Sequence, residues 1–92
     1  MTSATRGIGK SVHSPDQAAF CKLMVRARAA AGLTQQALAF RLKTPQSFVA
    51  KYEGGERRID VVEFVTICQA IGADSAKILK ILKNAIRGSS SV

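Results

Sequence analysis

The sequence has one histidine and two cysteines, which are few residues for catalysis or metal binding. His13 lies in a polar N-terminal segment, where we expect it to be solvated. A nucleophile, a base and a group that orients the base cannot be assembled around it, so the sequence argues against an enzyme. Cys21 and Cys68 fall inside apolar helical stripes and lack the histidine pair of a zinc site. We predict reduced core thiols, no metal and no cofactor.

Long apolar runs are also missing. No run approaches the roughly 18 residues that a membrane-spanning helix needs, and the N-terminus lacks the apolar core of a signal peptide. We therefore expect a cytoplasmic protein with no membrane partner.

Acidic residues are scarce, with 6 Asp and Glu against 14 Lys and Arg, and the net charge is +8. Such an excess predicts a polyanionic partner, with nucleic acid as the first candidate. At 92 residues, of which 47% are hydrophobic, the chain has room for one small domain with a single core.

The chain divides into three segments. Residues 1–13 form a basic leader without apolar periodicity, and residues 88–92 form a Ser-rich tail, so we predict that both are disordered. An alternative for the leader is an arm that follows DNA into a minor groove through Arg6 and Lys10. Residues 14–87 form the folded domain.

Capping signals mark helices on either side of the central region. The first helix begins at Ser14-Pro15, a cap residue followed by a proline that needs no backbone donor, and ends at Gly32. A later helix begins with the capping box Asp60 to Glu63. We expect its inner face to consist of Val61, Phe64, Val65, Cys68 and Ile71.

The central region contains two short helices with a very short link. Their apolar stripes are formed by Leu38, Ala39 and Leu42 and by Val49 and Tyr52. Thr34 is a good cap for the first, while Thr44-Pro45 places a cap and a first-turn proline at the start of the second. Since only Lys43 and Thr44 separate the helices, the two must touch, and Ala39 lies at their crossing.

The segment from about Phe20 to Ile86 resembles the Cro/phage-repressor family of helix-turn-helix regulators, also called the xenobiotic-response-element (XRE) family. The flanking sequences Gly32-Leu33-Thr34-Gln35 and Tyr52-Glu53-Gly54-Gly55-Glu56-Arg57-Arg58 match its pattern. The resemblance implies an all-α, five-helix, lambda-repressor-like DNA-binding domain with the helix-turn-helix at its second and third helices. One position departs, because Lys43 stands where the family usually has a glycine of positive φ.

Base-reading side chains are needed on the exposed side of the recognition helix, near its N-terminus. Because Val49 and Tyr52 point inward, this side consists of Gln46, Ser47, Ala50 and Lys51. Gln46 can form two hydrogen bonds with adenine, and Lys51 can donate to guanine O6 or N7.

Phosphate contacts need positive charge and free amide donors. The first motif helix begins with such donors, and the resemblance implies that Gln35 is the backbone clamp. Arg57 and Arg58 follow the recognition helix, and the turn between the motif helices faces the same strand. The predicted phosphate contacts are therefore Thr34, Gln35, Gln36, Lys43, Thr44, Arg57 and Arg58.

Arg28 and Glu53 match a pair of the family pattern, which implies an ion pair between the first helix and the end of the recognition helix. We expect this pair to be structural. If it is well shielded, loss of one partner costs about 3–5 kcal/mol; the alternative is an exposed, nearly neutral pair.

The last helix begins near Asp74 or Ser75 and has an unusually broad apolar side. The resemblance implies a two-fold dimer contact here through Ile81 and Ile86, and the alternative is burial of this side within the monomer. The opposite side is basic and either contacts phosphates or is solvated.

These observations predict a transcriptional regulator, a repressor, that binds double-stranded DNA by occupying a palindromic operator as a homodimer. The main alternative is the antitoxin of a toxin-antitoxin pair, which binds a toxin protein and represses its own promoter. A further alternative is an adaptor that binds only protein.

Overall fold

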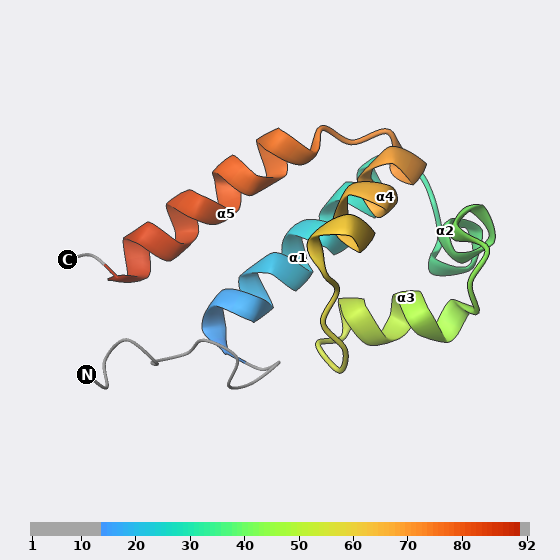
Figure 1. Ribbon diagram of the computed structural model, residues 1–92, viewed down its shortest axis with the longest axis horizontal. Helices are drawn as coiled ribbons and strands as arrows, with labels where there is room; N and C mark the ends of the chain where they lie inside the picture. The colour runs from blue at the N-terminus through green and yellow to red at the C-terminus, as the bar shows by residue number, and fades with distance from the viewer. Residues whose placement is uncertain (1–13, 91–92) are drawn as a thin grey trace.

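The fold consists of five helices, and no strand occurs in the described part of the chain. The computed structural model describes residues 14–90, with side chains up to residue 86. The helices are α1 Pro15–Ala30, α2 Gln35–Leu42, α3 Gln46–Glu53, α4 Val61–Ile71 and α5 Ser75–Ser90 (Figure 1). The all-α, five-helix expectation is confirmed. The predictions for Arg6, Lys10 and His13 in the leader, and for residues 91–92 of the tail, fall outside the described residues.

Three of the expected caps are present. The Ser14 hydroxyl accepts from the Gln17 amide at 3.1 Å, and the Thr34 hydroxyl accepts from the Ala37 amide at 3.0 Å. At the start of α4 the Glu63 amide donates to Asp60 at 2.7 Å, and the Asp60 amide donates back to the Glu63 carboxylate at 2.9 Å. These bonds satisfy amide groups that have no partner within the helix, so they define where each helix begins.

One hydrophobic core joins all five helices. Its buried members are Met24, Leu38, Ala39, Val49, Tyr52, Phe64, Ile67, Cys68, Ile71 and Ile78. Ala39 is 3% exposed where α2 packs on α3, so a larger side chain there would push the two axes apart. The link between α2 and α3 is short and the two helices pack closely. Together these features fix the angle between the two helices.

The expected inner face of α4 is partly wrong. Val61 is 75% exposed and Val65 is 38% exposed, whereas Ile67, which we did not assign to the core, is 1% exposed. Two overlapping apolar stripes run along this helix, and packing buries the one through Phe64, Ile67 and Ile71. Its larger side chains remove more apolar area from water than Val61 and Val65 would.

The turn between α2 and α3 has the left-handed residue that we expected. Lys43 has φ 59° and ψ 43°, and no other described residue besides glycine has a positive φ. The Thr44 amide then donates to the Ala39 carbonyl at 3.0 Å and closes the helix end.

Replacing Lys43 with glycine should stabilise the protein. The left-handed conformation costs a non-glycine residue about 1–2 kcal/mol, and the added chain entropy of glycine offsets about 0.5–1 kcal/mol of that gain. We expect a melting temperature several degrees higher, measured by circular dichroism, with an unchanged spectrum. An unchanged or lower melting temperature would show that Lys43 makes a compensating contact in this turn.

The expected start of α3 is wrong by one residue. Thr44 does not cap the helix; the N-cap is Pro45, with φ −65° and ψ 153° and no side-chain hydrogen bond. The Pro45 carbonyl accepts from the Phe48 amide instead. Thr44 is turned inward, and its hydroxyl is buried without a partner among the described residues.

Replacing Thr44 with valine should therefore raise the free energy of unfolding by about 1 kcal/mol, because a buried hydroxyl without a partner costs about 1–3 kcal/mol and valine has nearly the same shape. The matched control is Thr34→Val, which removes the hydroxyl that caps α2. This change should lower the free energy of unfolding by about 1 kcal/mol. Chemical denaturation of both variants measures the difference. Equal losses in the two variants would mean that Thr44 has a partner such as water.

The last helix lies away from the recognition helix. α5 packs on α1 and α4, whereas α3 packs on α1 and α2, and the two lie on opposite sides of the molecule in Figure 1. α5 continues through Gly88 to Ser90, so the last helix extends three residues beyond the expected domain boundary at residue 87.

Candidate DNA interface

The four residues expected to read bases share the open side of α3. Gln46, Ser47, Ala50 and Lys51 are all exposed. On the other side, Val49 is 0% exposed and Tyr52 is 3% exposed, and both belong to the core. The Tyr52 ring also packs against Phe48, with ring centroids 5.3 Å apart. The helix is thus held rigidly along its inner side. Its outer side carries the amide of Gln46, the hydroxyl of Ser47, the methyl group of Ala50 and the ammonium group of Lys51.

The structure brings Arg28 and Glu53 into contact, as the resemblance implies. The Arg28 Nε donates to Glu53 Oε2 at 2.7 Å, and Nη2 donates to Oε1 at 3.0 Å. The side chains are 15% and 3% exposed, so the pair is well shielded. Arg28 also donates to the Leu33 carbonyl at 2.7 Å, which ties the start of the helix-turn-helix to the same pair.

Gln35 extends this pair toward the open side of α3. Its amide nitrogen donates to Glu53 Oε1 at 2.9 Å, and its amide oxygen accepts from the side chain of Gln46 at 3.5 Å. A chain of polar contacts therefore runs from the buried Arg28 through Glu53 and Gln35 to Gln46. Sequence reasoning assigned Gln35 only to a phosphate, and nothing in the local pattern indicated this bridging role.

Arg57 is engaged within the protein. Its guanidinium donates to both Glu63 oxygens, at 3.1 and 3.3 Å, and to the Arg58 carbonyl at 2.9 Å. It also lies 4.8 Å from the centre of the Phe48 ring, a cation–π contact. The hydrogen bonds from Arg57 hold the pKa of Glu63 below its usual value, so this contact is lost only as the pH falls through the lowered pKa.

The remaining residues expected to contact phosphates differ in accessibility. Thr34, Gln36, Lys43 and Arg58 are exposed. Arg58 forms no ion pair with any described residue, in contrast to Arg57. The Thr44 hydroxyl is buried without a partner among the described residues, so of this set it is the least accessible side chain.

The two cysteines have the properties expected of core thiols. Both are free and buried, and burial raises the pKa of each thiol. The Cys21 thiol donates to the Tyr52 carbonyl at 3.3 Å, which adds a further contact between α1 and α3. Within residues 14–90, no cluster of His, Cys, Asp and Glu side chains is suited to hold a metal ion.

The residues assigned to a dimer contact are accessible. Ile81 is 49% exposed and Ile86 is 39% exposed, whereas Ile78 is 8% exposed, so burial within the monomer accounts for only part of the broad apolar side of α5. Leu79, on the same helix, is 48% exposed. Sequence reasoning missed Phe40 of α2, which is 84% exposed and opposite the buried stripe of that helix.

Comparisons with known proteins agree with this geometry. A helix-turn-helix domain family matches residues 22–79, which include α2 and α3. Among solved structures, an XRE-family-like protein from Pseudomonas syringae pv. tomato str. DC3000 is 46% identical, with a TM-score of 0.74. The match covers 80% of this chain and 90% of that one. This chain belongs to the XRE-like helix-turn-helix family. A search of curated proteins found no match.

Membership of the XRE-like family makes the protein a DNA-binding transcriptional regulator, and the family is typically not enzymatic. None of the helices in the described range is both long and apolar enough to cross a membrane.

Proposed function

We propose that this XRE-like protein is a repressor that occupies a palindromic operator as a homodimer. The observation that carries the proposal is the recognition helix itself, whose inner side is locked into the core and whose outer side presents Gln46, Ser47 and Lys51. A rigid helix with polar groups on one open side fits the major groove, where hydrogen-bond donors and acceptors distinguish the base pairs. Repression then follows from occupancy of the operator, without any catalytic step.

Phosphate contacts position this helix in the proposed complex. The backbone amides of Gln35 and Gln36, in the first turn of α2, have no acceptor within the helix. The positive end of the helix dipole lies at the same place and favours a phosphate. Thr34 and Lys43 flank this site, and Arg58 lies beyond the other end of α3. We assign Arg57 a weaker phosphate contact, because Glu63 already neutralises much of its charge.

The dimer in this proposal forms through α5, by way of Ile81 and Ile86. Two copies related by a two-fold axis would place their recognition helices about 34 Å apart, one turn of DNA. Sedimentation at micromolar concentration tests this contact with Ile81→Glu and Ile86→Glu, which should give monomers. Val62→Glu is the matched control, since Val62 is 74% exposed on α4 and should leave the dimer intact. A wild-type monomer, with or without DNA, would overturn the proposed dimer.

Selection from a pool of random duplexes, at stated salt concentrations, tests the proposed operator. We expect enrichment of a palindrome whose half-sites are about 10 base pairs apart, centre to centre. A pool without enrichment would contradict sequence-specific binding. Copurification of a second protein that prevents DNA binding would favour the antitoxin function instead.

Replacing Arg58 with glutamine should weaken binding to operator and random DNA alike. Loss of one phosphate contact should reduce the slope of log affinity against log salt by about one unit. The matched control is Lys80→Gln, which removes an exposed cation of α5, the helix that lies on the opposite side of the molecule from α3 in Figure 1. A slope that stays the same in Arg58→Gln, or falls equally in both variants, would remove Arg58 from the interface.

A further inference from the structure

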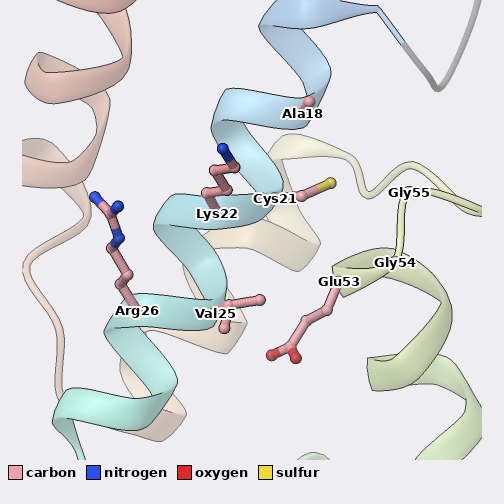
Figure 2. Close-up of a pocket in the computed structure, with 8 residues that line it drawn as sticks. All are labelled: Ala18, Cys21, Lys22, Val25, Arg26, Glu53, Gly54 and Gly55. Carbon is pink, nitrogen blue, oxygen red and sulfur yellow. The ribbon is translucent and has the colours of Figure 1, made fainter.

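A pocket of about 520 Å³ lies between α1 and the end of the recognition helix, away from the base-reading residues. One wall is the stripe Ala18, Cys21 and Val25 of α1, and the other is the turn Gly54-Gly55 that follows α3. Figure 2 shows Cys21 and Val25 projecting from α1 toward this turn. The volume is within the range of about 300–1,000 Å³ that small-molecule sites occupy.

Two glycines form one wall of the pocket. A Cβ atom on Gly54 would lie 3.0 Å from the Ala50 carbonyl oxygen, a tight contact at the end of α3. Gly55 has φ 82°, a conformation that side chains rarely adopt, and it is buried. The turn therefore contributes bare backbone to the pocket, and α1 contributes the apolar side chains Ala18, Cys21 and Val25.

The charged groups of the pocket favour an anion. Lys22 and Arg26 line it, are exposed, and form no ion pair within the described chain. Glu53 also lines it, but both of its oxygens are occupied by Arg28 and Gln35. In Figure 2 the charged ends of Lys22 and Arg26 project from α1 away from both the Glu53 carboxylate and the Gly54-Gly55 turn, so they border the pocket rather than point into it. The net effect is an apolar surface bordered by two unpaired positive charges.

We propose that this pocket binds a small organic carboxylate with a flat apolar body, whose carboxylate contacts Lys22 and Arg26 and whose body lies on Val25 and the Gly54-Gly55 turn. From Ala18 to Arg26 the helix rises about 12 Å, so the pocket wall is long enough for a fused two-ring carboxylate. The ligand would touch the end of the helix that we assign to base recognition.

Titration of the isotope-labelled full chain with 2-naphthoate, followed by amide nuclear magnetic resonance, tests the site without DNA. We expect saturable shifts at Cys21, Val25, Gly54 and Gly55, with a dissociation constant on the order of 1 mM or tighter. The neutral analogue 2-naphthylmethanol should bind at least about fivefold more weakly, because it lacks the charge that the two cations attract. Equal binding of both compounds, or shifts scattered over α5, would overturn the proposal.

A double variant distinguishes the effect of Lys22 and Arg26 from the effect of the protein's overall positive charge. Lys22→Gln with Arg26→Gln should abolish the preference for the acid over the alcohol, whereas Lys80→Gln with Lys83→Gln, on α5, should retain it. All four positions are exposed, so both variants should keep the fold, which circular dichroism checks. Retention of the preference in the first variant would exclude the assigned cations. Since no DNA is present, these results do not depend on the proposed operator.

Discussion

Replacing Arg28 with alanine should lower the free energy of unfolding by about 3–5 kcal/mol, because the change leaves the Glu53 charge buried without its partner. The Glu53 side chain is 3% exposed, and Arg28 supplies two of the three side-chain hydrogen bonds to it. Gln35, its remaining partner, is neutral. Alanine also removes the bond to the Leu33 carbonyl, which adds to the loss.

Thermal and chemical unfolding of Arg28→Ala measure this cost. Each kcal/mol corresponds to about 4–8 °C in a domain of this size, so the melting temperature should fall by more than about 12 °C. Arg26→Ala is the matched control, since it removes an exposed arginine of the same helix that has no described ion-pair partner. Similar melting temperatures for the two variants would show that the pair is energetically neutral despite its shielding.

Arg28→Ala should also weaken DNA binding, and this effect can be measured separately from the loss of stability. Glu53 holds Gln35, and Gln35 contacts Gln46, so release of the carboxylate loosens the support of a base-reading side chain. At a temperature where the variant is still folded, we expect weaker binding to the operator. Arg28 itself does not belong to the open side of α3, so this loss reports positioning rather than a lost DNA contact.

Local signals in the sequence predicted the fold well at positions where a residue type has only one favourable structural role. Ser14, Thr34 and Asp60 cap their helices as expected, since a short polar side chain before an apolar stripe has few other uses. The inward positions Val49 and Tyr52 follow from helical spacing. Lys43 required the family resemblance, because nothing in a lysine indicates a positive φ.

The errors arose where tertiary packing chose between two locally acceptable arrangements. Thr44 and Pro45 are both suitable residues for a helix start, and the crossing of α2 and α3 selects Pro45. In α4, two apolar stripes compete, and contact with the other helices buries the one that contains Ile67. The polar chain from Arg28 through Glu53 and Gln35 to Gln46 joins three helices, so its geometry exists only in the folded protein.

Replacing Gln46 with alanine should cost about 1–3 kcal/mol in binding to the selected operator and relax the preference at one base position. Random duplexes should be bound almost as well as before, because non-specific affinity comes from phosphate contacts that this change leaves in place. The fold should be retained, since Gln46 is exposed and its described side-chain contact is a 3.5 Å hydrogen bond to Gln35.

Competition binding of operator and single-base variants, at one salt concentration, measures both quantities. Gln36→Ala is the matched control, because Gln36 is an exposed glutamine at the start of α2 whose backbone amide, rather than its side chain, is assigned to a phosphate. We expect the control to keep the base preference, whereas Gln46→Ala loses it. Equal losses of Gln46→Ala on operator and random DNA would assign Gln46 to the DNA backbone. The rest of the open side of α3 would then have to carry the specificity.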